Sequence, residues 1–372
     1  MTAGPLRAAI AGIAGPALLA EEAALFRAFP PAGVILFARN IQDPAQLTGL
    51  IAALRTVLPA TADLMIDQEG GRVARLKPPH WHAHPPAATF GRLFATNPAA
   101  ALRAAWLTGA LIGEDCRTAG FTVAAAPVLD LAVPGAHDVV GDRAFARHPA
   151  IVARLGQSLA NGLLAAGILP VCKHAPGHGR ARADSHLALP RVTGSGLSAD
   201  IRPFALNALL PWMMTAHIVY DAIDPYRPAT LSPTAIETVI RGRIGFQGVL
   251  VTDDLAMKAL SGPPAGLAIQ ALNAGCDVAL YCSGEFAPTQ DLLRTCPALT
   301  PAALQRLENG RHAAANQRLT LNPALLNAER ERLLVSCPVD LAQLAPRQWD
   351  RQATENKKLV PCFPDTANSQ SG

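Results

Sequence analysis

Eight short apolar runs recur along the first 285 residues, and each is followed by turn residues and then by a longer helix-like stretch. Runs without polar alternation are typical of strands buried on both faces, as in a parallel sheet covered by helices. The expected strands are residues 7–13, 32–37, 63–68, 121–131, 167–174, 212–220, 248–254 and 277–282.

The stretches between these runs predict helices. Leu102, Trp106 and Ile112 recur at helical spacing within residues 101–119, and Ser232 before Pro233 is a typical helix start. Eight alternations of strand and helix indicate an α/β fold, a single (β/α)8 TIM-type barrel with a C-terminal helical extension. An open doubly wound sheet is disfavoured, because no G-x-G-x-x-G follows the first run.

The pattern turns helical after Cys282. Thr300-Pro301 predicts the start of one helix, and Pro323 marks a break before another. We therefore expect a catalytic barrel over residues 1–285 and a helical extension packed on it over residues 286–347. The polar residues 348–372 predict a poorly ordered tail.

The amino-acid composition limits the classes of binding partner and the compartment that fit this chain. Apolar residues make up 50% of the chain and charged residues 16%, enough to bury a large core. The net charge of +4 comes without a long basic block, so nucleic-acid binding has no support. The 7 cysteines are scattered, with no C-x-x-C pair, which favours reduced thiols in the cytoplasm.

Two uncharged segments bear on the compartment. Residues 8–20 could pass for a short signal sequence, but Gly12 and Pro16 make a poor apolar helix and the segment is needed as the first strand. Residues 203–220 are long enough to span a bilayer, yet they contain Pro211 and several polar side chains. We expect a cytoplasmic monomer with no membrane partner.

Polar residues directly end several of the apolar runs. The active site of a barrel forms at the carboxyl ends of its strands, so these residues are candidates for chemistry. They are Arg39, Asn40, Asp67, Glu69, Asp130, Lys173, His174, His217, Asp253 and Asp254. Asp253 or Asp254 could act as a nucleophile or could cap the following helix; only one of them can cap, and both interpretations stay open.

The stretch "KHAPGHGRARADSH", residues 173–186, raises an acid/base hypothesis. Asp184 could accept a hydrogen bond from one imidazole nitrogen of His186 and raise the basicity of the other, which makes a proton shuttle. Taken alone, a D-x-H pair is more often a solvated loop histidine beside a turn aspartate.

Two further features point to the same end of the barrel. Gly70 and Gly71 let the chain turn sharply after a strand, so that Asp67 faces the barrel mouth. Arg75 and Arg143 could clamp ligand hydroxyls or carboxylates, or could form surface ion pairs.

Four histidines near the fifth and sixth predicted strands could hold a metal ion: His174, His178, His186 and His217. Metal-dependent barrel hydrolases usually carry an H-x-H pair at the end of the first strand, whereas this strand ends "AGIAGP". We expect neither a metal nor a cofactor.

The motifs, in this order, resemble glycoside hydrolase family 3 and, within it, the bacterial cytoplasmic β-N-acetylglucosaminidases of peptidoglycan recycling. The resemblance covers roughly residues 9–285 and is carried most specifically by residues 173–190. The supporting motifs are "GVILFARNI", "IDQEGGRVARL", "APVLDL", "GDRAF", "KHAPGHGRARADSHLALP", "MTAHIVY", "GFQGVLVTDDLAMKAL" and "ALNAGCDVALYC".

The resemblance implies a retaining glycosidase in which Asp253 is the nucleophile. His186, with Asp184 as its partner, is implied as the acid/base. The residues implied to contact sugar hydroxyls are Asp67, Arg75, Arg143, Lys173 and His174. The implied reaction removes terminal non-reducing N-acetylglucosamine from β-1,4-linked 1,6-anhydro-N-acetylmuramyl peptides, so the partner is a small carbohydrate or muropeptide. Catalysis assisted by the substrate amide typically uses an adjacent Asp-Glu pair, and the chain contains no such dipeptide.

The resemblance also has a departure and leaves alternatives. Ala175 stands where the family usually has Phe, which removes apolar bulk beside Lys173 and His174. Arg180 and Arg182 could contact an anionic aglycone or lower the pKa of His186. The alternatives are a β-glucosidase or β-xylosidase of the same family, which generally carries its acid/base on another domain, and a non-catalytic sugar-binding barrel.

Overall fold

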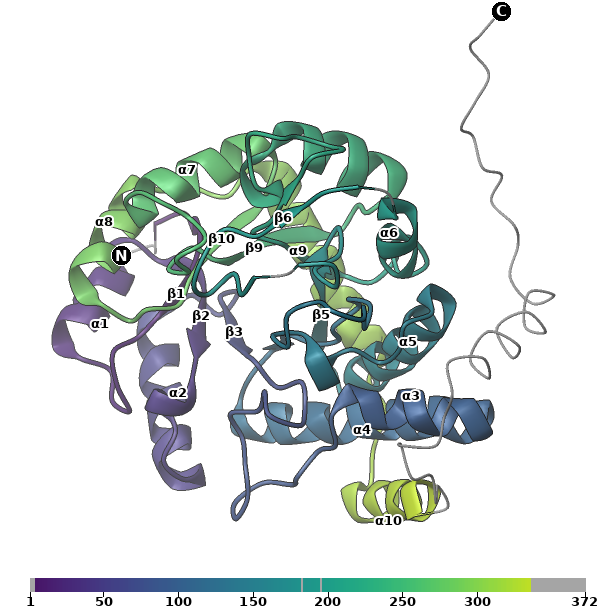
Figure 1. The fold of residues 1–372 in the computed structure, drawn as a ribbon. Coiled ribbons are helices and arrows are strands. Elements are labelled where there is room, and N and C mark those ends of the chain that lie inside the picture. The colour runs from purple at the N-terminus through teal and green to yellow at the C-terminus, as the bar shows by residue number, and fades with distance from the viewer. Residues whose placement is uncertain (1–3, 182, 195, 336–372) are drawn as a thin grey trace, which may run out of the picture.

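The computed structural model describes residues 4–181, 183–194 and 196–335, and they form a closed parallel barrel surrounded by helices (Figure 1). Its strands pair in the order β1-β10-β9-β7-β5-β4-β3-β2, and β1 joins β10 to close the ring. The strands are β1 Arg7–Gly12, β2 Pro31–Leu36, β3 Asp63–Ile66, β4 Val123–Ala124, β5 Leu169–Ala175, β7 Trp212–Thr215, β9 Val249–Asp254 and β10 Val278–Tyr281. The predicted (β/α)8 barrel is confirmed.

Two barrel strands, β4 and β7, are less than half as long as their predicted apolar runs. β4 covers only Val123–Ala124 of the run 121–131. The run 212–220 divides into β7 and a separate strand, β8 Val219–Tyr220, which pairs with β6 Arg191–Val192 outside the barrel. An apolar run therefore marks burial here, and only part of it joins the barrel ladder.

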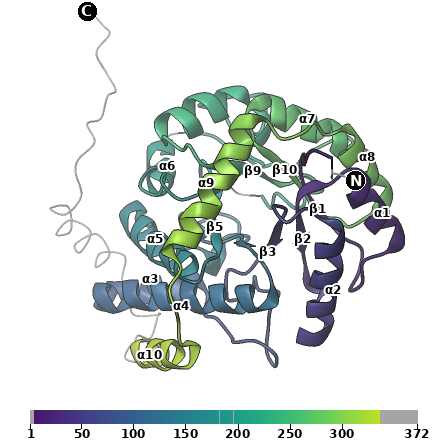
Figure 2. The ribbon, with the colours of Figure 1, turned by 180° about the vertical axis from the view of Figure 1, so that it is seen from behind.

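Helices cover the outside of the barrel (Figures 1 and 2). They are α1 Ala20–Ala28, α2 Pro44–Val57, α3 Ala87–Thr96, α4 Pro98–Ala119, α5 Pro149–Ala165, α6 Leu197–Ala205, a π-helix over Ala235–Arg243, α7 Pro264–Ala274, α8 Phe286–Thr295, α9 Pro301–Gln317 and α10 Pro323–Val335. Short 3-10 turns lie at Ala38–Asn40, Gly141–Arg143 and Ala229–Leu231.

The predicted helix starts hold. Thr300 Oγ1 accepts from the Ala303 N–H at 3.1 Å, and Ser232 Oγ accepts from the Ala235 N–H at 3.1 Å. Such bonds satisfy backbone donors that have no partner inside the helix. Within the described ranges, no helix has the length and apolar character needed to cross a bilayer.

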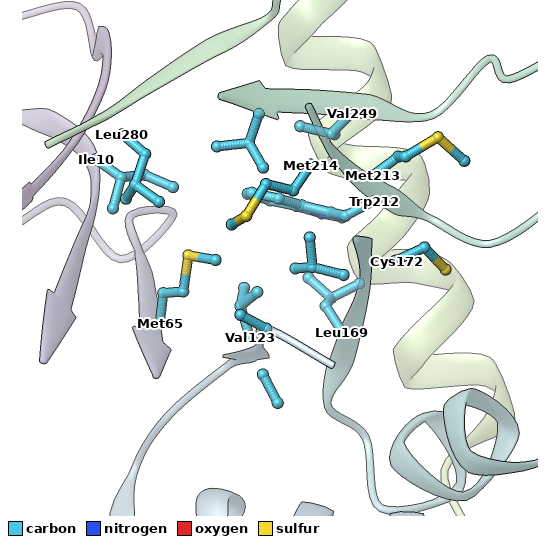
Figure 3. Close-up of a cluster of buried hydrophobic side chains, with 14 of the residues drawn as sticks. Ile10, Met65, Val123, Leu169, Cys172, Trp212, Met213, Met214, Val249 and Leu280 are labelled. Carbon is cyan, nitrogen blue, oxygen red and sulfur yellow. The ribbon is translucent and has the colours of Figure 1, made fainter. Parts of the chain in front are cut away.

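Buried side chains from neighbouring strands fill the barrel (Figure 3). Ile10, Met65, Trp212 and Leu280 are among those that are almost fully buried. A barrel of eight strands has an interior that side chains fill, so it is a packed core and not a pore. The polar chemistry is therefore confined to the ends of the barrel.

The helices after the barrel close its opposite end and reach back to an early loop. α9 crosses in front of the strands in the rear view (Figure 2), and its Arg311 binds the Asp63 carboxylate at 2.7 Å at the start of β3. α10 lies against α4, and Arg330 donates to His84 Nδ1 at 2.9 Å. The His84 carbonyl accepts from the Gly71 N–H at 2.8 Å. The division of the chain at residues 285 and 347 remains a prediction. The end of the predicted extension, residues 336–347, and the tail predicted for residues 348–372 lie outside the described residues.

Candidate active site

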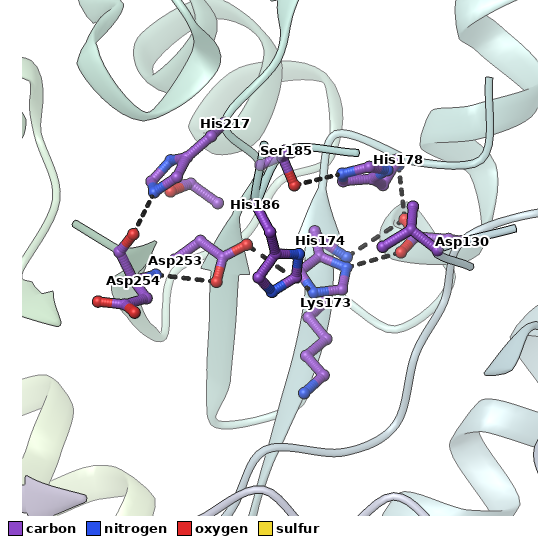
Figure 4. A network of polar contacts seen from close by, with 12 residues as sticks. Asp130, Lys173, His174, His178, Ser185, His186, His217, Asp253 and Asp254 are labelled. Carbon is purple, nitrogen blue, oxygen red and sulfur yellow. Dashed lines mark hydrogen bonds and ion pairs between the residues drawn. The ribbon is translucent and has the colours of Figure 1, made fainter. Parts of the chain in front are cut away.

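A polar pocket opens at the carboxyl ends of the barrel strands (Figure 4). The residues implied by the resemblance to act in catalysis or sugar binding line it, except Asp184, which contacts His186 instead. Of the other strand-end candidates, Glu69 and Asp254 line the pocket, whereas Arg39, Asn40, Asp130 and His217 do not. The polar and charged lining residues are Asp67, Glu69, Arg75, Arg143, Lys173, His174, His178, Ser185, His186, Asp253 and Asp254. The barrel thus brings together residues that lie up to 187 positions apart, from Asp67 to Asp254.

The two aspartates at the end of β9 have different surroundings. Asp254 Oδ1 accepts from the backbone N–H groups of Ala256 and Cys282, both at 2.9 Å, so it organises the turn and ties it to β10. Among the described residues, Asp253 accepts a hydrogen bond only from the N–H of Asp254, at 2.8 Å. Its other carboxylate oxygen lies 4.0 Å from His174 Nε2. The helix expected directly after these aspartates is not formed, because residues 255–260 make a turn and α7 begins only at Pro264. The capping interpretation is therefore wrong: Asp254 holds this turn, and the Asp253 carboxylate is left to line the pocket.

The electrostatic setting keeps Asp253 ionised. Burial would raise the pKa of its carboxyl, but the nearby imidazoles of His174 and His217 outweigh this and hold the pKa below its usual value. The pKa of Asp254 is raised, chiefly by burial. At neutral pH the pocket thus presents the carboxylate of Asp253 as its available anion at this strand end.

His217 supports this turn from β7. Its Nε2 lies 2.9 Å from the carbonyl oxygen of Asp254, which can only accept, so Nε2 carries the proton. Its Nδ1 then accepts from the hydroxyl of Thr230 at 2.7 Å. Burial lowers the pKa of His217, so it is neutral and holds the turn by hydrogen bonding.

A buried ionic cluster forms the floor of the pocket beside β3 and β5. Lys173 Nζ lies 3.0 Å from Asp67 and 2.6 Å from Glu69. Arg143 binds Glu69 through two hydrogen bonds of 2.8 Å, and Arg75 lies 3.1 Å from Asp67. The paired arrangement satisfies the desolvated charges and holds three cationic side chains at fixed positions.

The cluster also fixes the protonation states. Burial would raise the pKa of Asp67, but Lys173 and Arg75 hold it well below its ordinary value. Burial would likewise raise the pKa of Glu69, but Arg143 and Lys173 hold it below its usual value. The pKa of Lys173 is raised despite its burial, because Asp67 and Glu69 favour its charge. At neutral pH these groups therefore line the pocket as charged side chains.

Asp130 organises the histidines from the neighbouring strand end. Its Oδ2 accepts from His174 Nδ1 at 2.7 Å, and its Oδ1 accepts the backbone N–H groups of His174 at 3.3 Å and His178 at 2.6 Å. The Nδ1 proton of His174 is therefore committed to Asp130, and its Nε2 faces the pocket. Asp130 is fully buried, and the charges of His174 and His178 hold its pKa below the usual value against that burial.

The predicted Asp184 and His186 pair is formed. His186 Nδ1 donates to Asp184 Oδ1 at 2.8 Å, and the same oxygen accepts the His186 backbone N–H at 2.9 Å. The Nε2 atom is thereby left for proton transfer. The pKa of Asp184 is lowered, since its bonds to His186 outweigh the effect of burial. Figure 4 shows His186 in the same view as Asp253, His174 and Lys173, and it lines their pocket.

The predicted turn after β3 is also present. Gly70 and Gly71 have φ values of +96° and +56°, a region that side chains disfavour. A Cβ atom on Gly70 would come within 2.6 Å of the Pro85 carbonyl oxygen. The turn returns the chain so that both Asp67 and Arg75 reach the pocket.

Sequence reasoning missed three supporting residues of the site. Glu69 and Asp130 were placed at strand ends but received no role, and Ser185 was not considered. The signal for Glu69 was its position two residues after Asp67, which returns its side chain to the same side of an extended chain. No sequence signal identified the partners of Asp130 or Ser185, because these contacts join segments that are distant in the chain or curled into a loop.

The departure from the family motif and the loop arginines lie as follows. Ala175 is fully buried in the hydrophobic core and does not line the pocket. Arg180 is bound to Asp200 at 2.6 Å, so its charge is engaged. Arg182 lies outside the described residues. Over the part of the chain that the structure describes, no group of three His, Cys, Asp or Glu side chains is arranged to hold a metal ion.

Comparison with known proteins agrees with this geometry. Residues 17–313 match the family model for the glycosyl hydrolase family 3 N-terminal domain. The chain is 38% identical over 314 residues to a beta-hexosaminidase from Aromatoleum aromaticum, covering 82% of this chain and 88% of that protein. It is 39% identical over 282 residues to a beta-hexosaminidase from Xylella fastidiosa, covering 74% of this chain and 83% of the relative.

Solved structures give the same answer. NagZ from Neisseria gonorrhoeae, in complex with N-trifluoroacetyl-D-glucosamine, superposes with a TM-score of 0.77 at 30% identity and covers 89% of this chain and 98% of that one. A family 3 β-N-acetylglucosaminidase from a Paenibacillus strain has a TM-score of 0.70 at 29% identity, with 92% of this chain and 65% of that one covered. The chain therefore belongs to glycosyl hydrolase family 3. Its activity is that of a β-N-acetylhexosaminidase, and it is similar to the NagZ enzymes.

Proposed function

We propose that the enzyme is a retaining exo-β-N-acetylglucosaminidase that acts on muropeptides during cell-wall recycling in the cytoplasm. Its proposed substrates carry terminal non-reducing N-acetylglucosamine β-1,4-linked to 1,6-anhydro-N-acetylmuramyl peptides. Asp253 is the proposed nucleophile, and His186 with Asp184 is the proposed acid/base pair. The observation that carries the proposal is that the ionised Asp253 and His186 line the same pocket. The Nδ1 atom of His186 is held by the Asp184 carboxylate at 2.8 Å.

The two proposed roles follow from the surroundings. Asp253 has one carboxylate oxygen turned to the pocket beside His174, which suits attack on an anomeric carbon. His186 directs its proton through Nε2, since Nδ1 is bound to Asp184. In the first step Asp253 forms the covalent bond while His186 protonates the departing glycosidic oxygen. In the second step His186 takes a proton from water, which hydrolyses the glycosyl-enzyme.

The ionic cluster explains how the sugar would be held. Lys173, Arg143 and Arg75 present N–H donors, and Asp67 presents an acceptor, around one side of the pocket. Charged groups form stronger hydrogen bonds to hydroxyls than neutral groups do, and their mutual pairing keeps them rigid before substrate arrives. Binding energy from these contacts would place the anomeric carbon against Asp253.

The catalytic assignment is tested with an aryl N-acetyl-β-glucosaminide. Asp253→Ala should abolish hydrolysis, and His186→Ala should reduce it strongly; wild-type turnover by Asp253→Ala would sink the assignment. A fluorinated N-acetylglucosaminyl donor that slows the second step should label wild-type enzyme at Asp253, as read by peptide mass spectrometry. An inverting enzyme would carry no label.

The substrate is tested separately. A purified disaccharide-peptide from cell-wall turnover should release N-acetylglucosamine and the anhydro-muropeptide, as read by mass spectrometry. Comparable turnover of an aryl β-glucoside or β-xyloside would instead favour the other activities of the family. Sugar binding without turnover over a long incubation would favour a non-catalytic barrel.

A further inference from the structure

The loop that carries Asp184 and His186 contains one buried residue between two more exposed ones. The side chain of His186 is 60% exposed, so its own packing cannot fix its position over the pocket. Ser185 is only 2% exposed. The position of the pair therefore depends on how Ser185 is held.

Ser185 is bonded on two sides to the barrel end. Its hydroxyl lies 3.1 Å from His178 Nε2, at the start of the same loop (Figure 4). Its carbonyl accepts the N–H of Ala259 at 3.1 Å, from the segment that follows Asp253. One residue thus connects the acid/base loop both to β5 and to the segment that follows the proposed nucleophile.

His178 is itself firmly anchored. Its backbone N–H donates to Asp130 at 2.6 Å, the same carboxylate that binds His174 Nδ1. Its ring packs edge-on against His174 with 5.6 Å between centroids. The ring is buried, and its Nδ1 has no hydrogen-bond partner in the described part of the structure, so the contact with Ser185 is its side-chain hydrogen bond there.

We propose that Ser185 is a positioning residue, and that its hydroxyl, held by His178, fixes His186 at the height needed to protonate the leaving group. The inference rests on the proposed acid/base role of His186. Asp130 then serves both halves of the site, because it holds the sugar-facing imidazole of His174 and, through His178, the proton donor. Loss of the hydroxyl leaves the Asp184 and His186 contact intact but lets the pair move as a unit.

The experiment compares two leaving groups. Protonation matters most when the leaving group is poor, as in a disaccharide, and little when it is good, as in a dinitrophenyl glycoside. Ser185→Ala should lower kcat on the disaccharide about tenfold, the scale of one buried hydrogen bond, and should change dinitrophenyl turnover far less. KM should stay near the wild-type value, since the sugar-binding residues are untouched.

Two controls separate positioning from general damage. Ser232→Ala removes another buried, hydrogen-bonded hydroxyl outside the pocket and should leave the ratio of the two rates unchanged. In a cycle with His178→Ala, the double variant should show the same rate ratio as each single variant, because both remove one bond. Ser185→Thr, which keeps a hydroxyl, should restore the ratio.

Equal loss on both substrates in Ser185→Ala would overturn the inference, provided that His186→Ala shows the leaving-group dependence. Additive effects in the cycle would also overturn it. If His186→Ala lacks that dependence, the acid/base assignment fails and the role of Ser185 falls with it. The proposed nucleophile would stand in either case, since labelling of Asp253 is measured independently.

Discussion

Asp130→Asn is the substitution that the structure predicts most sharply. Asp130 is fully buried, and its two oxygens accept from His174 Nδ1 at 2.7 Å and from the His178 N–H at 2.6 Å. Asparagine retains one acceptor oxygen and replaces the other with an NH2 donor. If the oxygen keeps the backbone contact, the NH2 group faces His174 Nδ1 and can be satisfied only by the other tautomer of the ring.

The magnitude follows from these bonds. A hydrogen bond to a charged group contributes about 1.5–3 kcal/mol, and the variant loses one such bond and the charge that supports the second. If the loss falls on the transition state, kcat/KM falls about tenfold to a hundredfold. The melting temperature should also drop by several degrees, because the same bonds hold the folded site.

The matched control is Asp63→Asn at the opposite end of the barrel. Asp63 is also buried, and it binds Arg311 at 2.7 Å and the hydroxyl of Thr122 at 3.0 Å. Both variants should be less stable in thermal unfolding, but only Asp130→Asn should lose kcat/KM on an aryl N-acetyl-β-glucosaminide. Wild-type activity in Asp130→Asn, or an equal loss in Asp63→Asn, would refute the reasoning.

Three further outcomes are expected. Asp254→Asn keeps the oxygen that accepts two backbone N–H groups and should retain at least about a tenth of wild-type kcat. Asp253→Asn should lower kcat about a thousandfold or more. Equal losses in steady-state assays would remove the distinction between the two aspartates. Glu69→Gln leaves Lys173 and Arg143 without their shared anion. The variant should raise KM about tenfold and lower the free energy of unfolding in urea by about 3 kcal/mol. An unchanged KM would show that Lys173 and Arg143 do not orient the sugar. The carboxyls of Asp67, Glu69 and Asp130 have pKa values below those of the unfolded chain. Their contribution to stability is therefore complete above about pH 5 and is lost as the pH falls through about 4 and below. Urea unfolding between about pH 7 and about pH 3 measures this loss of stability, and a free energy of unfolding that does not change with pH would contradict the prediction.

The barrel could be predicted from the sequence because each of its strands overlaps a continuous apolar run. The pattern could not show where a run leaves the ladder. Pro127 has no N–H to donate and lies soon after β4 ends, although the chain stays buried through Asp130. The run 212–220 stays buried as well, but its end pairs with Arg191–Val192 outside the barrel. Hydrophobicity reports burial, whereas pairing depends on partners elsewhere in the chain.

The site shows the same division. Strand ends located Asp67, Lys173, His174 and Asp253 at the barrel mouth, because topology alone places them there. The choice between Asp253 and Asp254 stayed open, since it depends on the N–H of Cys282, which is contributed by a different strand. A residue's position along a strand predicts where it lies, but its hydrogen-bond partners decide what it is free to do.

The bond between Arg330 and His84 has a consequence for the order of events during synthesis. It joins residues 246 positions apart, and His84 in turn holds Gly71 beside the turn that delivers Asp67 and Arg75. A chain emerging from the ribosome cannot form this hydrogen bond until α10 has left the exit tunnel. The turn that we propose to hold the sugar is therefore secured only after almost all of the described chain has been translated. A nascent barrel without α10 would accordingly hold this proposed substrate site less firmly than the folded enzyme does.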